Sequence, residues 1–482
     1  MIPQVLSVRP EPKFELSPFL YMQFMEPLGD HDPSVEAAWD FQRDKWHDDV
    51  IGAARRLGPT MIRWGGIFSS YYKWREGVGP RGGRRPMYNI AWGGMESNQV
   101  GTHEFVGFCR KVRAEPLICV NFASDGKARW AHPLKGGARA GTAAEAAAWV
   151  RYCNDPADRD RRRNGADRPL KVRYWQIGNE TSYGKGGFDC ETAGRYTARF
   201  ARAMRRADRN IKLIGWGDSG WAPRMIELAG EQLDYLAFHH HFQSGLPDSP
   251  LVGEQYRKDP ARTWDHLMNA WKSTQEKIDL MRQQVAGAGL GLAMTESHFS
   301  LPGRNRCEVL SSWAAGVAYA RILNVHARNG DLLKIATLAD FIGTQWQVVA
   351  LMVRPRGQSY LMPVGSVMSL FRHHTGRHAV EVVKSPAGID ATASMTGRRV
   401  FLHVVNTSRT RAARVRVEMP PLRIKSGRVF MIAADPQTEV METCPDVFSV
   451  KERALAPSGV LELPPAAVAA VEMETAPFPM AG

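Results

Sequence analysis

Eight short apolar runs, separated by longer amphipathic segments, constrain the fold of this chain more than any other feature of its sequence. The runs lie at residues 19–26, 60–66, 115–122, 171–179, 211–217, 233–239, 290–296 and 333–341. Strands that alternate with helices form a parallel sheet, and strands buried on both faces read as nearly continuous apolar runs. Eight such units close a (β/α)8 barrel. The sequence therefore predicts an α/β protein built on a TIM barrel.

The sequence changes character after about residue 375, where helical periodicity gives way to short alternating segments. Residues 399–405, 414–419 and 467–473 alternate apolar with polar side chains and are separated by Pro, Gly and Asn. This pattern is typical of an antiparallel β-sandwich. The first 15 or so residues also favour a strand that could pair with this sandwich. We therefore expect a barrel domain at 19–374 and a β-sandwich domain formed by 1–18 together with 375–482.

Two glutamates stand at the ends of predicted strands four and seven. Active sites of TIM barrels lie at the carboxyl ends of the strands. Run four leads into Asn179 and Glu180, and run seven ends in Glu296, so the two carboxylates lie nearly opposite each other across the barrel mouth. A pair of carboxylates that flanks the scissile bond is what glycoside hydrolysis requires. The sequence thus predicts a glycoside hydrolase.

The neighbours of each glutamate predict its role. Glu180 follows the apolar Trp175 and Ile177, and apolar surroundings raise the pKa of a carboxylic acid so that it can donate a proton. Glu296 lies among hydroxyl and imidazole side chains, which favour an ionised carboxylate. We expect Glu180 to be the general acid/base and Glu296 the nucleophile, provided that they lie about 5 Å apart.

The net charge of +14, from 63 Lys and Arg against 49 Asp and Glu, raises the question of a nucleic-acid partner. Charge indicates such a partner only where it is concentrated. The densest basic run, at 159–163, is interleaved with acidic residues and is predicted to be a solvated loop. No zinc-finger spacing and no phosphate-binding Gly-rich loop accompanies it. We therefore expect no nucleic-acid partner, and the charge has no explanation at this stage.

The sequence carries no signal for secretion or membrane insertion. The N-terminus lacks a basic segment followed by an apolar one, and no stretch of 18 apolar residues occurs. The six cysteines are scattered without a CxxC pair, which argues against a disulfide framework. We expect a cytoplasmic protein with reduced thiols, with no membrane partner and no cofactor.

Six motifs lie in a distinctive order along the chain. They are Met61-Ile-Arg-Trp-Gly-Gly66, Tyr174-Trp-Gln-Ile-Gly-Asn-Glu180 and the segments 16–29, 73–79, 91–101 and 114–116. Together they resemble glycoside hydrolase family 51, the α-L-arabinofuranosidases, and the C-terminal part from 403 to 465 resembles the β-sandwich of that family. The resemblance implies a retaining double displacement on a (β/α)8 barrel, a carbohydrate partner, and a homo-oligomer that is a hexamer or trimer.

The resemblance also implies roles for single residues. Glu180 matches the acid/base of the family, and Asn179 matches an asparagine that binds the sugar hydroxyl next to the anomeric carbon. Glu296 falls at the position of the nucleophile, although the usual Asp-Glu-Trp is replaced by Met-Thr-Glu-Ser-His. Glu26 matches a carboxylate that binds sugar hydroxyls, and Arg63 matches an arginine that supports the nucleophile. Gln358 matches a glutamine that contacts substrate.

The triple histidine at 239–241 departs from the family, which has His-Arg-Tyr there. His239 and His241 share one face of a strand, so a two-histidine metal site with Glu296 or His298 as a further ligand is one interpretation. Histidines that line a sugar pocket by hydrogen bonding are the favoured interpretation, and no metal is expected. Trp92 could present its flat face to a sugar ring.

The loop after the second strand is a further departure, because it reads Trp64-Gly-Gly-Ile67 where the family has Tyr-Pro-Gly-Gly-Asn. A polar group that would bind the sugar is therefore missing, and Ile67 and His241 alter the subsite that selects the sugar. We expect an exo-acting retaining α-L-arabinofuranosidase. The alternatives are the same mechanism on another furanoside or pyranoside, and a non-catalytic carbohydrate-binding barrel.

Overall fold

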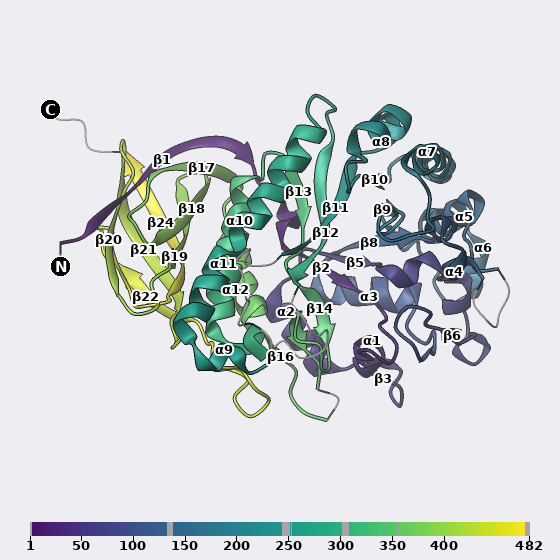
Figure 1. The fold of residues 1–482 in the computed structure, drawn as a ribbon, viewed down its shortest axis with the longest axis horizontal. Coiled ribbons are helices and arrows are strands. Elements are labelled where there is room, and N and C mark those ends of the chain that lie inside the picture. Colours follow the sequence, from purple (N-terminus) through teal and green to yellow (C-terminus); the bar gives the residue numbers. More distant parts are fainter. Residues whose placement is uncertain are drawn as a thin grey trace.

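The computed structural model describes residues 2–132, 138–242, 251, 253–300, 308–354 and 356–477. Within these residues the strands form a parallel sheet that closes into a barrel and, beside it, a mostly antiparallel sheet (Figure 1). The strands of the barrel coincide with the first seven predicted runs, and the (β/α)8 prediction is confirmed. They are β2 (Met22–Met25), β5 (Met61–Trp64), β8 (Glu115–Val120), β9 (Tyr174–Ile177), β10 (Lys212–Trp216), β11 (Tyr235–Phe242) and β12 (Gly291–Phe299).

The eighth run is divided between two strands instead of forming one. β13 (Leu333–Ala336) pairs with β12, whereas β14 (Asp340–Gly343) pairs with β2, where Asp340 lies opposite Phe24. Between them the hydroxyl of Thr337 donates a hydrogen bond to the carbonyl of Ala339 at 2.9 Å, a local bond that competes with the strand ladder. The eighth position of the barrel is thus shared by β13 and β14, and the sheet continues through β15 (Val349–Met352) and β16 (Tyr360–Leu361).

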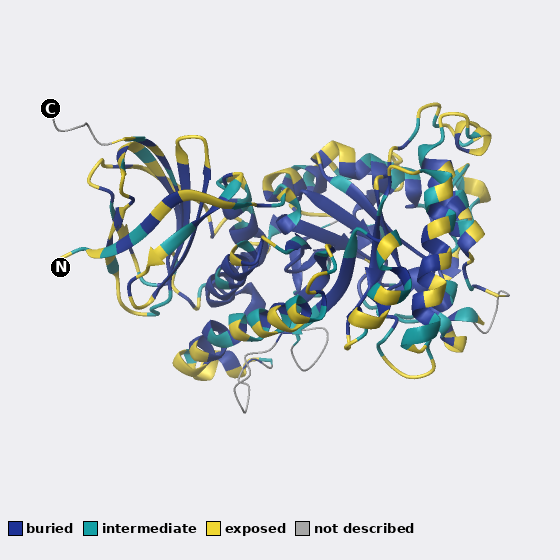
Figure 2. Cartoon of the chain, turned by 90° about the horizontal axis from the view of Figure 1, so that it is seen from above, coloured by how far each residue is buried: buried dark blue, intermediate teal, exposed yellow. Residues whose placement is uncertain are grey.

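Helices surround the barrel with their buried faces towards its strands, as Figure 2 shows. Their ends follow ordinary capping chemistry: Asp189 accepts the N–H of Thr192 at 2.7 Å at the start of α7, and α2 ends at the left-handed Gly58. No helix of the described ranges is both long enough and apolar enough to cross a membrane. The longer helices are α2 (Asp48–Leu57), α3 (Thr102–Val112), α5 (Ala143–Asn154), α7 (Cys190–Ala207), α8 (Ala222–Ala229), α10 (Pro260–Gln284), α11 (Trp313–Arg328) and α12 (Pro363–His373).

Shorter elements lie in the loops that connect the strands and helices of the barrel. They are the helices α1 (Ser34–Ala37), α4 (Ala128–Ala131), α6 (Arg159–Arg163) and α9 (Gln255–Lys258), and the paired strands β3 (Trp39–Asp40) with β4 (Lys45–Trp46) and β6 (Met87–Tyr88) with β7 (Met95–Glu96).

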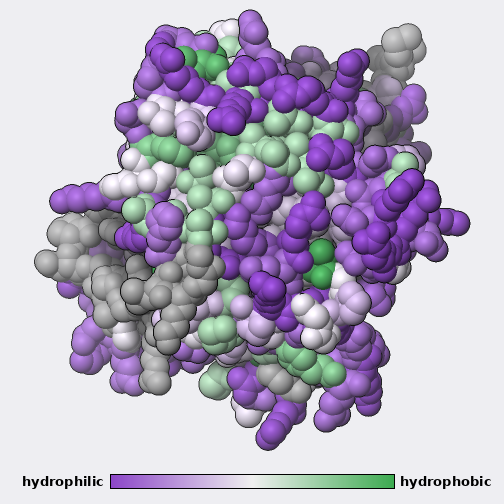
Figure 3. Space-filling view, turned by 90° about the vertical axis from the view of Figure 1, so that its right-hand side faces the viewer, coloured by the Kyte–Doolittle hydropathy of each residue, from purple (hydrophilic) through white to green (hydrophobic). Residues whose placement is uncertain are grey.

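The basic run at 159–163 is the helix α6, so the prediction of a solvated loop is wrong. Asp158 caps the helix by accepting the N–H of Arg161 at 2.7 Å. The guanidinium of Arg161 is fully buried and donates to the carbonyls of Tyr152 at 3.0 Å and Ala166 at 3.1 Å. Figure 3 shows a mostly hydrophilic surface on this side of the molecule, with hydrophobic side chains in small areas. At least one arginine of the run is therefore part of the folded interior.

The second sheet curls around its own hydrophobic core, which includes Leu6, Val404 and Leu461. The N-terminal strand β1 belongs to this sheet, antiparallel to β17 and, as an exception to the pattern, parallel to β20. The domain bounds at 18/19 and 374/375 stay a prediction. The strands are β1 (Gln4–Glu15), β17 (His378–Lys384), β18 (Ile389–Thr396), β19 (Arg399–Asn406), β20 (Ala413–Glu418), β21 (Leu422–Ile432), β22 (Lys451–Leu455), β23 (Val460–Leu463) and β24 (Val468–Pro477).

Trp313 at the start of α11 joins the barrel to the C-terminal sheet. Its indole is fully buried, packs at a tilt against Phe448 with 5.0 Å between ring centroids, and donates to the carbonyl of Ala466 at 2.8 Å. Replacing it by alanine opens a cavity and leaves this carbonyl unsatisfied, so we expect Trp313→Ala to lower the free energy of unfolding by about 3–5 kcal/mol. Chemical denaturation measures this. The control Leu280→Ala, at a side chain that is 47% exposed, should change the free energy of unfolding by less than about 0.5 kcal/mol. If both variants lost the same amount, Trp313 would not be the residue that joins the two parts.

Candidate active site

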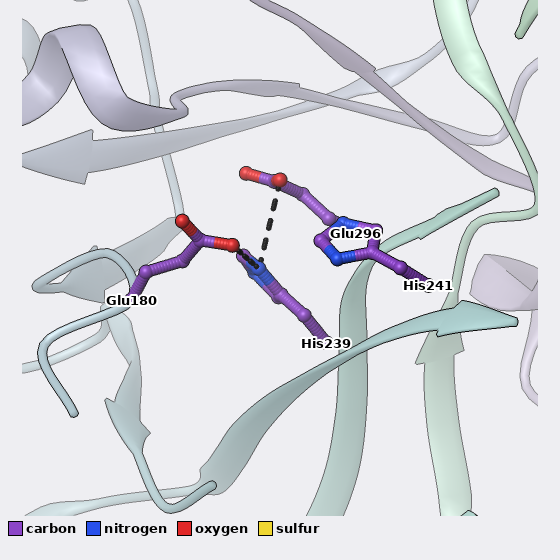
Figure 4. Close-up of side chains that lie close together, drawn as sticks. All are labelled: Glu180, His239, His241 and Glu296. Carbon is purple, nitrogen blue, oxygen red and sulfur yellow. Dashed lines mark hydrogen bonds and ion pairs between the residues drawn. The ribbon is translucent and has the colours of Figure 1, made fainter. Parts of the chain in front are cut away.

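Two carboxylates come together at the carboxyl ends of the barrel strands, as Figure 4 shows. Glu180 follows β9, and Glu296 lies near the end of β12. One oxygen of Glu180 and one oxygen of Glu296 lie within 4.8 Å of each other. This upper limit lies below the roughly 6.5–9.5 Å that separates the carboxyl groups of inverting glycosidases, and it agrees with the closer pair of retaining ones, at roughly 5–5.5 Å.

Glu180 is held on a tight turn at the end of β9. Gly178 and Glu180 both adopt positive φ, at 81° and 50°, and a non-glycine residue in that region is strained and must be held by its surroundings. The buried carboxylate of Asp125 holds the turn by accepting the N–H of Asn179 at 3.2 Å and the hydroxyl of Thr181 at 2.6 Å. Burial raises the pKa of Glu180 above its usual range, although His241 and Lys127 lower it in part. Glu180 is thereby suited to hold a proton.

Glu296 is aimed by a bulge in β12. Phe238 of β11 lies opposite Met294, but the next residue, His239, lies opposite Glu296, so Thr295 is the extra residue. Bulges beside active sites re-aim a side chain in this way. The fully buried guanidinium of Arg63 donates to Glu296 Oε1 at 2.8 Å, which stabilises the ionised carboxylate.

Arg63 and His239 lie behind the two glutamates and hold them in place. Arg63 also donates to the side-chain oxygen of Asn179, so it joins the two strand ends. Nδ1 of His239 lies 3.1 Å from Glu180 Oε1 and 3.5 Å from Glu296 Oε2, and its Nε2 lies 3.0 Å from the hydroxyl of Thr295. Burial lowers the pKa of His239 to about 4, so the imidazole is neutral at neutral pH. Its Nδ1 thus lies between an oxygen of Glu180 and an oxygen of Glu296.

A cavity of about 240 Å³ opens in front of the two glutamates. Five predicted residues line it, namely Glu26, Trp92, Glu180, His241 and Glu296, and so does Ile67. Gln358 does not: it is exposed and is not among the lining residues, so the structure does not bring it into the site. The remaining lining residues are Phe24, His298, Phe299, Ser300, Asp340, Trp346 and Val348.

Glu26 lies in the cavity wall and is held by two donors. Its Oε1 accepts the N–H of Phe68 at 3.1 Å and the indole N–H of Trp92 at 3.3 Å. Burial, with the nearby charge of Glu296, raises the pKa of Glu26 well above its usual range. The indole N–H at the edge of Trp92 is therefore bonded to the carboxyl of Glu26.

Gly66 makes room for Glu26. A Cβ at this position would lie 2.0 Å from Glu26 Oε2, and Gly66 has a φ of +156°. We expect Gly66→Ala to displace Glu26 and to lower kcat/KM for the best glycoside substrate by about 10²-fold, as a misplaced active-site group does. Gly52→Ala in α2, where a Cβ meets nothing within 4 Å, is the matched control. If both variants keep full activity, Glu26 has no part in the reaction.

The sequence reasoning missed two acidic residues that end the fifth and eighth runs. Asp218 follows β10, accepts the hydroxyl of Tyr183 at 2.6 Å and the backbone N–H of His239 at 3.2 Å, and pairs with Lys277. Asp340 lines the cavity, is buried, and its Oδ1 has no hydrogen-bond partner among the described residues. The same strand-end argument that found Glu180 and Glu296 would have named both.

Trp346 was not expected in the cavity wall either, and His298 was named only as a ligand of the alternative metal site. Their rings lie 5.7 Å apart, and the ring of His298 lies 4.5 Å from that of His241. Trp346 lies in the segment between β14 and β15, so the strand-end argument gives no signal for it. The fold and the pair of glutamates at the barrel mouth are the arrangement that glycoside hydrolases use.

Comparisons with known proteins agree with this class. The sequence profile of the α-L-arabinofuranosidase 1 domain matches residues 53–262. The intracellular exo-α-(1→5)-L-arabinofuranosidase of Streptomyces lividans is 27% identical over 432 residues, which are 82% of this chain and 62% of that protein. The probable α-L-arabinofuranosidase C of Aspergillus terreus is 32% identical over 232 residues, 45% of this chain and 42% of that protein. The chain thus covers less than two thirds of either relative.

Solved structures show the same fold. The thermostable GH51 α-L-arabinofuranosidase of Thermotoga petrophila has a TM-score of 0.80 at 22% identity, over 97% of this chain and 99% of that one. The TIM barrel with a C-terminal β domain is therefore confirmed as the fold. The resemblance of this chain to the α-L-arabinofuranosidases of glycoside hydrolase family 51 is confirmed as well.

Proposed function

We propose that this protein is a retaining, exo-acting glycoside hydrolase that removes terminal α-L-arabinofuranosyl residues from oligosaccharides or glycosides. One observation carries the proposal: Glu180 and Glu296 place carboxylate oxygens within 4.8 Å of each other at the mouth of the barrel. The resemblance to family 51 supports the choice of sugar. A non-catalytic carbohydrate-binding barrel is disfavoured, because binding alone does not require this pair.

In the first step Glu296 attacks the anomeric carbon with Oε2, since Oε1 is bound to Arg63. The bond from the anomeric carbon to the leaving oxygen breaks, and that oxygen takes the proton of Glu180. The result is a glycosyl ester on Glu296 and an ionised Glu180. Burial favours the protonated form of Glu180 before this step, and His241 and Lys127 stabilise the charge that it acquires.

In the second step Glu180 acts as a base. It takes a proton from water, the water oxygen attacks the anomeric carbon, and the ester bond to Glu296 breaks. Two displacements at one carbon restore its configuration, and both glutamates return to their starting protonation states. Asn179, fixed by Arg63, is the residue that would bind the neighbouring sugar hydroxyl.

The size and wall of the cavity support exo action on one sugar unit. Its volume of about 240 Å³ lies below the roughly 300–1,000 Å³ of pockets that hold drug-sized ligands. Asp340 adds a buried carboxyl whose pKa burial, with the charges of Glu26 and Glu296, raises well above its usual range. In its protonated form Asp340 offers an O–H to a sugar hydroxyl.

The sugar itself is the least constrained part of the proposal. Ile67 and His241 line the cavity at positions where the family has an asparagine and a tyrosine, so the same mechanism on another furanoside or pyranoside is the second candidate. A panel of aryl glycosides decides between them. We expect the 4-nitrophenyl α-L-arabinofuranoside to be the best substrate, and no hydrolysis of any member of the panel would contradict the proposal.

The pH dependence of kcat/KM should report the protonation of Glu180. The acid must carry its proton, so activity falls as the pH rises through its pKa, which burial raises above the ordinary 4.5. The rate profile of the wild-type protein should therefore have an alkaline limb above that value. Glu180→Gln, which cannot ionise, should lose this limb in its residual activity on a substrate with a good leaving group. An unchanged limb in the variant would assign it to another group.

We further propose a cytoplasmic location and a homo-oligomer, a trimer or hexamer, with no nucleic-acid and no membrane partner. The location is supported by the intracellular relative in Streptomyces lividans, and the assembly only by the resemblance to family 51. The mass of the protein in solution, by light scattering, tests the assembly, and a monomer would contradict it.

A further inference from the structure

Two imidazoles and two carboxylates converge at the barrel mouth (Figure 4). Glu180, His239, His241 and Glu296 each offer one ligand atom, and these atoms all lie within 4.8 Å of one another. The sugar reaction uses the two glutamates, but it gives His241 no task that requires a lone pair at this point. Imidazole nitrogen and carboxylate oxygen are among the ligands that zinc takes in proteins.

The spacing of these atoms is close to that of a tetrahedral zinc site. Zinc bonds of about 2.0–2.1 Å place the ligand atoms roughly 3.3 Å apart. Nδ1 of His239 already lies 3.1 Å from Glu180 Oε1 and 3.5 Å from Glu296 Oε2. The remaining pairs lie within 4.8 Å, and binding of the ion would draw them together.

Each of these atoms can offer a lone pair to a cation, which would replace the hydrogen bond between His239 and Glu180. Arg63 occupies Oε1 of Glu296, which leaves Oε2 for a cation. The hydroxyl of Thr295 lies 3.0 Å from Nε2 of His239, so the ring can keep its proton there while Nδ1 presents a lone pair. Such a partner on the far nitrogen is the usual support of a zinc-binding histidine. Two carboxylates at the same point offset the charge of a dication.

We propose that Glu180, His239, His241 and Glu296 bind one Zn²⁺ ion, and that the zinc-bound protein is inactive as a glycosidase. The bonds form by donation of lone pairs from two nitrogens and two oxygens, so nothing is oxidised or reduced. Zinc then holds the oxygen with which Glu296 would attack and the oxygen from which Glu180 would donate its proton. The inhibition rests on the proposed function, whereas the binding does not.

Calorimetric titration of the chelator-stripped, full-length protein with zinc chloride tests the binding. We expect one zinc per chain, and a dissociation constant that rises at least about 10- to 100-fold in His241→Gln and in Glu180→Gln. The matched control is His240→Gln on the same strand, because His240 faces the other way, with Nε2 3.3 Å from the hydroxyl of Ser273. This control should bind zinc as the wild type does.

Thermal melting without zinc shows whether each variant is folded. Two site variants are used so that the test stands even if one of them does not fold. The proposal is overturned if the wild type binds no zinc at millimolar concentration, or if neither site variant weakens the binding. It is also overturned if the zinc-saturated protein still hydrolyses its aryl glycoside, since we expect full inhibition that a chelator reverses. If no glycoside is hydrolysed even without zinc, the proposed function fails, and calorimetry alone decides the zinc site.

Discussion

Glu296→Ala is expected to lower kcat for an aryl α-L-arabinofuranoside by about 10⁴- to 10⁶-fold, as the loss of a nucleophile does in other hydrolases. The variant has no group that can form the glycosyl ester, whatever the leaving group. The loss should therefore be equally severe for aryl glycosides of good and of poor leaving groups. Steady-state rates on such a series measure it.

Azide separates a catalytic from a structural role of Glu296. A small anion can enter the space that the removed carboxylate leaves and attack the anomeric carbon from that face, which gives a glycosyl azide of inverted configuration. Glu115→Ala is the matched control, because Glu115 lies at the opposite end of the barrel, at the start of β8. Full activity of Glu296→Ala, or the same loss in the control, would remove Glu296 from the mechanism.

Glu180→Ala is expected to slow hydrolysis by about 10²- to 10⁴-fold for substrates with poor leaving groups, the usual contribution of a general acid. Activated aryl substrates need little protonation, so their first step should be nearly unaffected. The glycosyl ester should then accumulate, because its hydrolysis lacks a base. A burst of released phenol in rapid-mixing experiments measures this.

In this variant azide should give a product of retained configuration, since it attacks the ester on Glu296 from the side of the missing Glu180. The contrast with the inverted azide of Glu296→Ala distinguishes the two roles with one reagent. Equal losses for good and poor leaving groups would show that Glu180 only positions other groups.

Much of the barrel could be predicted because its signal is local. Strands buried on both faces are apolar throughout, so seven of the runs coincide with β2, β5 and β8 to β12. The eighth run was misread as one strand, since its apolar pattern continues through 337–339, where the backbone turns. That turn depends on the hydroxyl of Thr337 and on which neighbour each half pairs with, and pairing is not visible in one run.

The candidate site could be predicted where a strand end carries a polar residue. Glu180, Glu296, Arg63, Asn179 and His239 follow from that rule and lie together. Trp346 could not be found in this way, since its loop reaches the cavity only through the fold. The match of Gln358 rested on a short segment, and its exposed position shows that such a match does not place a side chain.

The net charge of +14 does not describe the site. The cavity contains Glu26, Glu180, Glu296 and Asp340, and the lining residues include no lysine or arginine. The arginine that does approach, Arg63, lies behind Glu296 and is fully buried. Carboxylates in this pocket favour the oxocarbenium-like transition state of glycoside hydrolysis, which carries positive charge.

The most direct test of the account is to locate the covalent bond. The wild-type protein would be incubated with a cyclophellitol-type analogue of arabinofuranose, digested, and mapped by peptide mass spectrometry. The account predicts one label per chain, on Glu296, and none in Glu296→Ala. A label on any other residue, such as Glu26 or Asp340, would contradict it.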